Sequence, residues 1–266
     1  MKETEVIKNT EKPIIKENLI EAYTKLGIMP NDTLLVHTSL SKLGFVIGGA
    51  QAVVESLIET LNQGTLIMPA HSGDLSDPKD WENPPVPNTW FESLYENMPA
   101  FNPDLTPSRS MGKVANCLLS MPKRKRSNHP QGSFTALGVN DDYITENHAL
   151  TPMFGMSSPL GKIYELKGKI LLLGVSYNRC TAFHLSEVIS NRVPKIIQGA
   201  PILIDGKRRW HNYEDYDYDS DDFEKLGNQL EAEGLVKHVN IGLSKAILLD
   251  FKTSVERVSE IMKKSR

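Results

Sequence analysis

The chain has 266 residues, of which 39% are hydrophobic and 24% are charged. Its 30 basic and 33 acidic side chains give a net charge of −3, so no overall basic field points to nucleic acid or a membrane surface. The N-terminal segment lacks the apolar core of a secretory signal, no apolar run reaches membrane-spanning length, and two cysteines are too few for a disulfide framework. We therefore expect a cytoplasmic protein that folds as one domain over residues 1–266.

The first third of the chain predicts a parallel crossover unit. An amphipathic helix follows Pro13 and ends at Gly27, and residues 33–38 (TLLVHT) predict a buried strand. A loop, SLSKLGFVIGG, then leads into a helix over 50–61 and a second strand, TLIMP, over 65–69. This order of strand, helix and strand is typical of two parallel neighbours in one sheet.

The rest of the chain continues to alternate strands and helices. Residues 70–107 predict a long structured loop, and such loops are usually functional. We then expect a helix over 111–120, strands near 133–139, a short helix over 160–166, the strand KILLLGV and the helix TAFHLSEVIS. The last part predicts a hairpin turning at 205–206, a helix over 222–233, a strand pair and a final helix. The predicted class is α/β, with a central mixed sheet flanked by helices.

A loop suited to an anion follows the first predicted strand. Thr38, Ser39, Leu40 and Ser41, followed by Gly44 and a Gly-Gly pair, place hydroxyls and free amides before a helix. Such amides bind a phosphate or pyrophosphate readily. The spacing matches neither the phosphate-loop motif nor the dinucleotide motif, so turn glycines with a serine cap remain an equal alternative.

Arginines in two further segments also suit phosphate. TPSRSMG places Arg109 at the start of a helix, and a basic run from Lys123 to Arg126 precedes a second motif. Arginine forks bind phosphate oxygens in pairs, which favours a multiply phosphorylated cofactor. The lysines of the basic run fit a solvated surface cluster better, so Arg109 is the preferred candidate.

The segment TAFHLSE predicts a catalytic base. Thr181 is a plausible N-cap, which places His184 in the first helical turn and Glu187 three residues on, along the same face. The positive end of the helix dipole disfavours an imidazolium there and keeps the ring suited to accept a proton. A structural histidine is the alternative.

Two rival chemistries use nearby residues. Cys180 precedes the predicted cap, so a thiol nucleophile activated by the helix start is one alternative, and a small buried side chain is the more common one. His37, His71 and Asp74 suggest a metal site, but no pair of ligands has a metal-binding spacing, and we predict no metal.

An acidic run spans residues 214–224 (EDYDYDSDDFE), with seven carboxylates and no basic residue. Such a run is usually a solvated surface. Interleaved tyrosines favour order, and carboxylates beside aromatic rings suit a polycationic ligand. We expect this acidic run to face a pocket near His184.

Taken in order, several segments resemble the aminoglycoside 3-N-acetyltransferase family. They are VHTSLSKLG with the following GG, GTLIMPAHS, WENPPVP, TPSRSMG, RSNHPQGSFTALG, FGMSSPLGKIYEL, LLLGV and TAFHLSE. The resemblance implies an α/β fold of the family's own type, distinct from the common N-acetyltransferase fold. It also implies direct acetyl transfer from acetyl-coenzyme A to the 3-amino group of the 2-deoxystreptamine ring of an aminoglycoside.

The resemblance also assigns residues. It makes His184 the general base, with Glu187, Asp217 and Asp222 as candidates for the carboxylate that orients it. The expected coenzyme residues are Thr38, Ser39, Leu40, Ser41, Gly44, Arg109, Ser127 and Phe134, and the expected acceptor residues are Asp74, Asp215 and Asp217. Thr38 stands where serine is frequent, and Ser186 stands where alanine is usual, which leaves the acceptor open.

The predicted partner is a polycationic amino sugar or another amine, with no nucleic acid or membrane partner, and a homodimer stays open. One alternative function is a related acyltransferase acting on a non-antibiotic amine. Another is a coenzyme A-binding regulatory protein without turnover.

Overall fold

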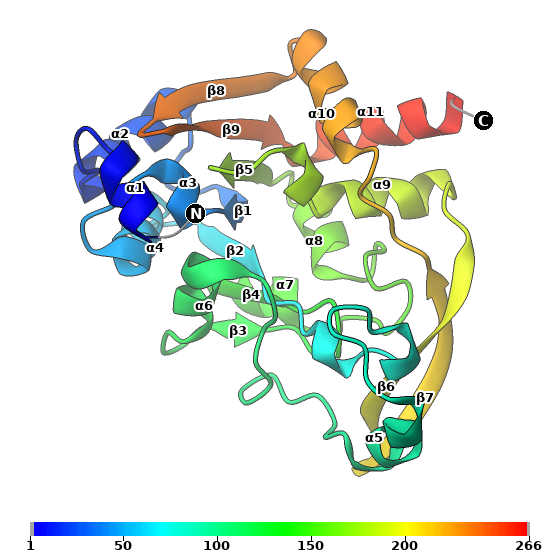
Figure 1. The fold of residues 1–266 in the computed structure, drawn as a ribbon. Helices are drawn as coiled ribbons and strands as arrows, with labels where there is room; N and C mark the ends of the chain where they lie inside the picture. The colour runs from blue at the N-terminus through cyan, green and yellow to red at the C-terminus, as the bar shows by residue number, and fades with distance from the viewer. Residues whose placement is uncertain (1–2, 265–266) are drawn as a thin grey trace.

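The structure is a computed structural model that describes residues 3–264. A seven-stranded mixed sheet lies at its centre, and helices surround this sheet (Figure 1). The strand order is β3-β4-β2-β1-β5-β9-β8. The strands are β1 (Thr33–Thr38), β2 (Thr65–Pro69), β3 (Lys125–Arg126), β4 (Phe134–Gly138), β5 (Lys169–Leu173), β8 (Val236–Ile241) and β9 (Ser244–Asp250).

The middle of the sheet is parallel and its edges are antiparallel. β1 pairs in parallel with β2 on one side and with β5 on the other, with Leu35 opposite both Ile67 and Ile170. β4 runs antiparallel to β2, and β9 antiparallel to β5. The predicted parallel crossover and the predicted α/β class with a central mixed sheet are therefore confirmed.

The structure contains α-helices along its whole length, and most of them cover the two faces of the sheet. They are α1 (Glu3–Asn9), α2 (Lys16–Leu26), α3 (Leu40–Leu43), α4 (Gly49–Thr60), α5 (Phe91–Asn97), α6 (Gly112–Leu119), α7 (Asp141–Thr145), α8 (Pro159–Glu165), α9 (Ala182–Ser190), α10 (Phe223–Ala232) and α11 (Phe251–Lys264).

Two hydrophobic cores result from the alternation of side chains along the strands. Leu34 and Val36 of β1 point into one core, which α2, α4 and α6 cover. Leu35 points into the other core, which α8, α9, α10 and α11 cover. Successive strand residues face opposite sides, so buried runs such as TLLVHT supply both cores at once.

The short helices α1, α3, α5 and α7 were not predicted. Each has four to seven residues, which is too short for an amphipathic repeat to be visible in the sequence. The longer helices lie within one or two residues of their predicted bounds. For α2, Gly27 ends the helix in the left-handed conformation with a φ of 85°, as expected of a glycine C-cap.

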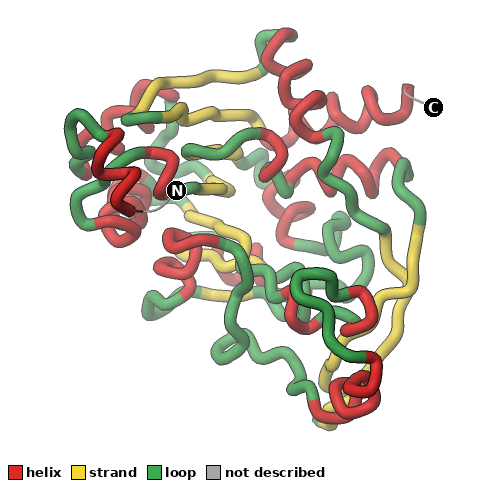
Figure 2. The backbone as a smooth tube through the Cα atoms, in the orientation of Figure 1, coloured by secondary structure: helices red, strands yellow, loops and turns green. Residues whose placement is uncertain are grey.

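A two-stranded hairpin projects away from the central sheet (Figure 2). It consists of β6 (Lys195–Ile204) and β7 (Lys207–Tyr216), and Asp205 and Gly206 form its turn with positive φ angles. The predicted hairpin is confirmed. The long loop after β2 contains α5, which packs against the hairpin where Arg208 Nε donates to the carbonyl of Met98 at 2.8 Å. No helix within residues 3–264 is long and apolar enough to cross a membrane.

Candidate active site

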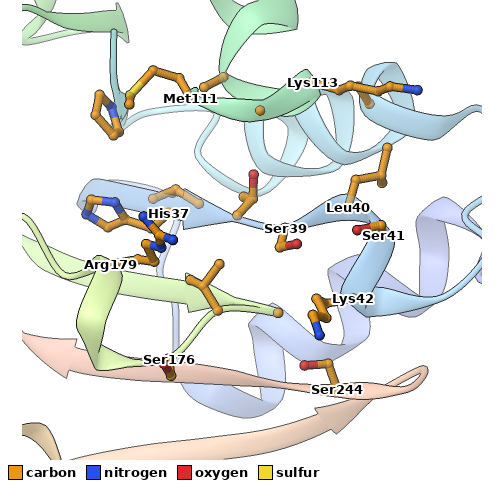
Figure 3. Close-up of a pocket in the computed structure, with 18 of the residues that line it drawn as sticks. His37, Ser39, Leu40, Ser41, Lys42, Met111, Lys113, Ser176, Arg179 and Ser244 are labelled. Atoms are coloured by element: carbon orange, nitrogen blue, oxygen red, sulfur yellow. The ribbon is translucent and has the colours of Figure 1, made fainter. Parts of the chain in front are cut away.

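A pocket of about 1620 Å³ opens at the carboxyl ends of β1 and β5. α4 follows β1 on one face of the sheet, and α9 follows β5 on the other face. Parallel strands whose connections leave to opposite faces form a crevice at their carboxyl ends, and this is where open α/β sheets bind ligands. Figure 3 shows the side chains of His37, Ser39 and Ser41 in the middle of the view. Met111 and Lys113 lie above them, and Ser176 and Ser244 lie below them.

The loop after β1 lines this pocket as predicted. Thr38, Ser39, Leu40, Ser41 and Gly44 all belong to its lining. The glycine has a φ of 104°, and a Cβ there would lie 3.0 Å from the Thr10 hydroxyl, so the turn requires glycine. The five predicted coenzyme residues of this loop therefore lie together.

Two amide-rich helix starts also border the pocket. Gly48 and Gly49 precede or begin α4, and both line the pocket. Gly48 has a φ of 80°, which an L side chain rarely adopts. At the start of α3, the amides of Leu40 and Ser41 have no hydrogen-bond partner among the described residues.

Four exposed basic side chains line the pocket, and none of them was predicted. They are Lys42, Lys113, Arg179 and Lys245. No ion pair joins any of them to a carboxylate within residues 3–264. Lys42 lies inside the predicted anion loop, so its position in the sequence next to Ser41 could have identified it. The other three come from segments far apart in sequence, and only the fold brings them together.

The central chemical feature is a pair formed by His184 and Glu187. His184 is the third residue of α9 and lines the pocket. Its Nδ1 lies 2.6 Å from Oε2 of Glu187, whose side chain is only 2% exposed. The other carboxylate oxygen, Oε1, accepts a hydrogen bond from the backbone amide of Asp219 at 3.1 Å. With the carboxylate ionised, Nδ1 carries the proton and Nε2 keeps its lone pair.

Aromatic rings enclose the imidazole of His184. Phe154 stacks on it with centroids 5.1 Å apart and an angle of 12° between the ring planes. Phe223 lies 4.8 Å away, and Tyr218 meets the ring edge-on at 5.3 Å. These contacts and the Glu187 hydrogen bond fix both the position and the plane of the ring.

Glu187, and neither of its two competitors, contacts His184. Asp217 and Asp222 are both exposed, and neither is hydrogen-bonded to the imidazole. Thr181 occupies the N-cap position of α9, as predicted, and His184 lies in the first turn; the backbone of Thr181 is helical, however, and its hydroxyl makes no capping hydrogen bond.

Two further histidines line the pocket with a buried Nε2 that has no hydrogen-bond partner. They are His37 and His71. Burial, together with the nearby His184, lowers the pKa of each to about 3, so both are neutral at physiological pH. Within residues 3–264, no three His, Cys, Asp or Glu side chains converge in a way that would hold a metal ion.

The thiol alternative is not supported by the geometry. Cys180 is fully buried and does not line the pocket. Burial raises the pKa of its thiol to about 12, so the nucleophilic thiolate is scarce at neutral pH.

Three predicted coenzyme residues do not line the pocket. Arg109 is bonded instead to the Asp74 carboxylate and to the carbonyl of Asn83, the latter at 3.1 Å. Ser127 is buried, and its hydroxyl accepts from the amide of Phe134 at 2.9 Å. The ring of Phe134 packs edge-on against His71 at 5.3 Å, one layer behind the pocket.

The predicted acceptor residues are dispersed. Asp74 is exposed and paired with Arg109, whereas Asp215 is buried and hydrogen-bonded within the chain. The acidic run passes beside His184, as expected, and contributes Ser220 and Phe223 to the pocket lining. None of its carboxylate residues is in that lining.

Fold and site together define an α/β protein with a histidine–glutamate pair at a large, basic pocket. The family model for aminoglycoside 3-N-acetyltransferase matches residues 35–263, so the chain belongs to this family. It is 40% identical over 256 residues to the SPbeta prophage-derived aminoglycoside N(3')-acetyltransferase-like protein YokD of Bacillus subtilis (strain 168), covering 94% of this chain and 93% of that protein. It is 28% identical over 277 residues to aminoglycoside N(3)-acetyltransferase VII of Streptomyces paromomycinus, covering 96% and 94%.

Solved structures agree with this membership. The crystal structure of YokD from Bacillus subtilis superposes with a TM-score of 0.95 and 37% identity, covering 98% of this chain and 97% of that one. The binary complex of AAC-IIIb with CoASH superposes with a TM-score of 0.83, covering 96% and 98%. Its identity is 24%, which supports likeness of fold alone. The family predicted from the sequence segments is confirmed.

Proposed function

We propose that this protein transfers the acetyl group of acetyl-coenzyme A to the 3-amino group of an aminoglycoside, with His184 as the general base. The observation that carries the proposal is the 2.6 Å contact between His184 Nδ1 and Glu187 at the edge of a pocket of about 1620 Å³. A ring oriented by a buried carboxylate, with Nε2 toward a substrate cavity, is the arrangement that proton abstraction requires.

The pocket suits the coenzyme. Lys42, Lys113, Arg179 and Lys245 supply positive charge for its phosphates, and the glycine-rich start of α4 adds backbone amides. The likeness of fold to AAC-IIIb, a protein solved with CoASH, is consistent with this use of the pocket. When bound, the coenzyme supplies the acetyl group as a thioester.

The reaction follows from the protonation state of the amine. An ammonium group first loses one proton to solvent, which leaves a neutral amine with a free lone pair. The amine nitrogen then bonds to the carbonyl carbon while His184 Nε2 takes its second proton, and the carbon–sulfur bond breaks. The proton on His184 passes to the leaving sulfur, so the base is restored. Glu187 stabilises the imidazolium in between, and the step contributes about 10²- to 10⁴-fold to the rate.

Backbone amides are the natural partners for the carbonyl oxygen as it gains negative charge. The amides at the start of α9 are occupied, since Thr181 donates to Arg179 and His184 donates to Thr181. We assign the role to the loop after β1, where the amides of Leu40 and Ser41 line the same pocket.

A cationic acceptor fits the surface next to His184. Ser220 lines the pocket, and the surrounding acidic run exposes Asp217, Asp219, Asp221 and Asp222. Exposed carboxylates beside the opening attract a polycationic amino sugar and steer it toward the base. Of the predicted acceptor residues, Asp217 keeps this role.

The test is release of free thiol from acetyl-coenzyme A in the presence of a panel of aminoglycosides and simple amines. We expect turnover with aminoglycosides that carry a free 3-amino group and none with 3-N-acetylated forms of the same compounds. Turnover only with unrelated amines would show that the acceptor is a different amine. The similarity to YokD, which is named an acetyltransferase-like protein, is compatible with that alternative. Coenzyme binding with no thiol release from any amine would refute the enzymatic proposal.

A further inference from the structure

Asp215 differs from the other carboxylates of the acidic run because it is only 2% exposed. Its Oδ2 accepts from the backbone amide of Met153 at 2.9 Å. Its Oδ1 accepts from the amide of Tyr216 at 2.8 Å and from the hydroxyl of Tyr218 at 3.3 Å. Both oxygens are engaged inside the protein, so this carboxylate is not available to bind an acceptor amine as the sequence predicted.

These hydrogen bonds join the acidic run to the loop over residues 151–155. The Tyr218 hydroxyl, which donates to Asp215, accepts from the amide of Phe154 at 3.1 Å. Thr151 Oγ1 donates to the carbonyl of Glu214 at 2.7 Å. With the contact between Met153 and Asp215, hydrogen bonds at three residues of this loop hold it to the acidic run.

The anchored loop carries the ring that stacks on the base. Phe154 is 4% exposed, and its ring stacks on the His184 imidazole with an angle of 12° between the two ring planes. Its ring also contacts His71 at 5.4 Å and Tyr218 at 4.9 Å. The plane of the imidazole is therefore set on one side by a ring whose own backbone depends on Asp215 and Tyr218.

We propose that Asp215 is a positioning residue: through Met153 and Tyr218 it holds Phe154 against His184 and so fixes the direction in which Nε2 faces the acceptor. This inference rests on the proposed role of His184 as the base. A small misalignment of a reacting pair costs a large factor in rate, so loosening the loop lowers turnover although no substrate contact is lost.

The kinetic test compares Asp215→Asn and Tyr218→Phe with the matched control Glu214→Gln, an exposed carboxylate of the same run that pairs with Lys195. We expect kcat to fall about 10- to 100-fold in both test variants. The KM for acetyl-coenzyme A should stay unchanged in both test variants. The control variant should keep the kcat of the original protein. Tyr218→Phe removes one hydroxyl and no charge, so it decides the question if Asp215→Asn does not fold. A rise in the KM for acetyl-coenzyme A with unchanged kcat would overturn the inference.

Two further readouts separate positioning from general damage. In a Phe154→Leu background, Asp215→Asn should have almost no additional effect on kcat, because both changes act through one ring. By NMR, the His184 ring protons, assigned by their loss in His184→Gln, should lose the ring-current shift of the stacked phenyl ring in Tyr218→Phe. Full additivity of the two substitutions, or an unmoved His184 signal, would contradict the inference. If His184→Gln itself remained active, the proposed function would fail while the NMR result still reported on the stack.

Discussion

The His184 imidazole has little freedom, because one carboxylate and three aromatic rings surround it. Glu187 fixes Nδ1, Phe154 fixes the plane, and Phe223 and Tyr218 fill the remaining sides. Glu187 is itself held by the amide of Asp219, which ties the pair to the acidic run. The proton-accepting nitrogen is thus oriented before any substrate arrives, and this preorganisation has measurable consequences.

Glu187→Gln should lower kcat by about 10²- to 10⁴-fold, with coenzyme affinity unchanged. A glutamine amide can donate to Nδ1, which favours the tautomer whose Nε2 carries a hydrogen and cannot accept a proton. The measurement is thiol release, with coenzyme binding followed by calorimetry. Asp222→Asn is the control: its exposed carboxylate does not contact His184, so kcat at saturating acceptor should change by less than about twofold, and any loss should fall on the KM for the acceptor. Equal losses in both variants would argue against the assigned pair.

Cys180→Ala should leave turnover nearly unchanged. The thiol is buried, and its pKa is raised to about 12, so it supplies no thiolate at neutral pH. The same burial should protect native Cys180 from iodoacetamide until the protein unfolds, while partly exposed Cys117 reacts more readily. An inactive Cys180→Ala variant that is still folded would point back to covalent catalysis.

At the level of elements, prediction from sequence succeeded where the interactions are local. The pair of His184 and Glu187 lies within one helical turn, so its spacing was visible in the sequence. The structure places Arg109 outside the pocket lining, bonded to Asp74, and no local pattern reveals that pairing because Asp74 is 35 residues away. Phe154 and Arg179 were missed for the same reason, since only the packing of distant segments brings them to the pocket.

The basic side chains of the pocket come from separate elements, and each should contribute to coenzyme affinity. We expect Lys42→Ala and Lys113→Ala to raise the KM for acetyl-coenzyme A by about tenfold each, the value of one hydrogen bond to a charged group. The effect should shrink at high salt. Arg109→Ala, outside the pocket, is the control and should leave this KM unchanged. An equal rise for Arg109→Ala would restore its predicted role.

At the scale of the whole molecule, one sheet separates two cores, and the strand order was not predictable from the chain order. The sequence indicated alternating strands and helices and a mixed sheet, and both are confirmed. The placement of β5 between β1 and β9 depends on long-range pairing. That placement creates the crevice between β1 and β5, so the pocket is a property of topology more than of any one motif.

Stability should fall steeply in mild acid because three buried histidines, and His71 with its buried Nε2, are held neutral. Burial lowers the pKa of His37 and His71 to about 3, that of His129 to about 4, and that of His148 well below its ordinary value of 6.5. Nδ1 of His129 also accepts from the amides of Gln131 and Gly132, and protonation would break both bonds.

The sign follows from proton uptake on unfolding. Between pH 4 and 6.5 the unfolded chain binds protons that the folded protein excludes, so the free energy of unfolding decreases as pH falls through 6.5. Each histidine contributes at most about 1.4 kcal/mol per pH unit, the limit for one proton taken up on unfolding. Urea unfolding at several pH values between 7 and 5 measures the slope. A free energy of unfolding that stays level over this interval would contradict the buried neutral state.

The imidazoles of His37 and His71, whose Nε2 atoms have no hydrogen-bond partner, can report ligand binding in the pocket. His37 and His71 line the pocket, remain neutral over the working pH range and lie close to His184. Their ring resonances are therefore insensitive to ordinary changes of buffer pH but sensitive to a new dipole or hydrogen bond nearby. Binding of an unlabelled ligand in the pocket can thus be followed from the histidine NMR signals of the protein. The measurement requires neither turnover nor an attached dye.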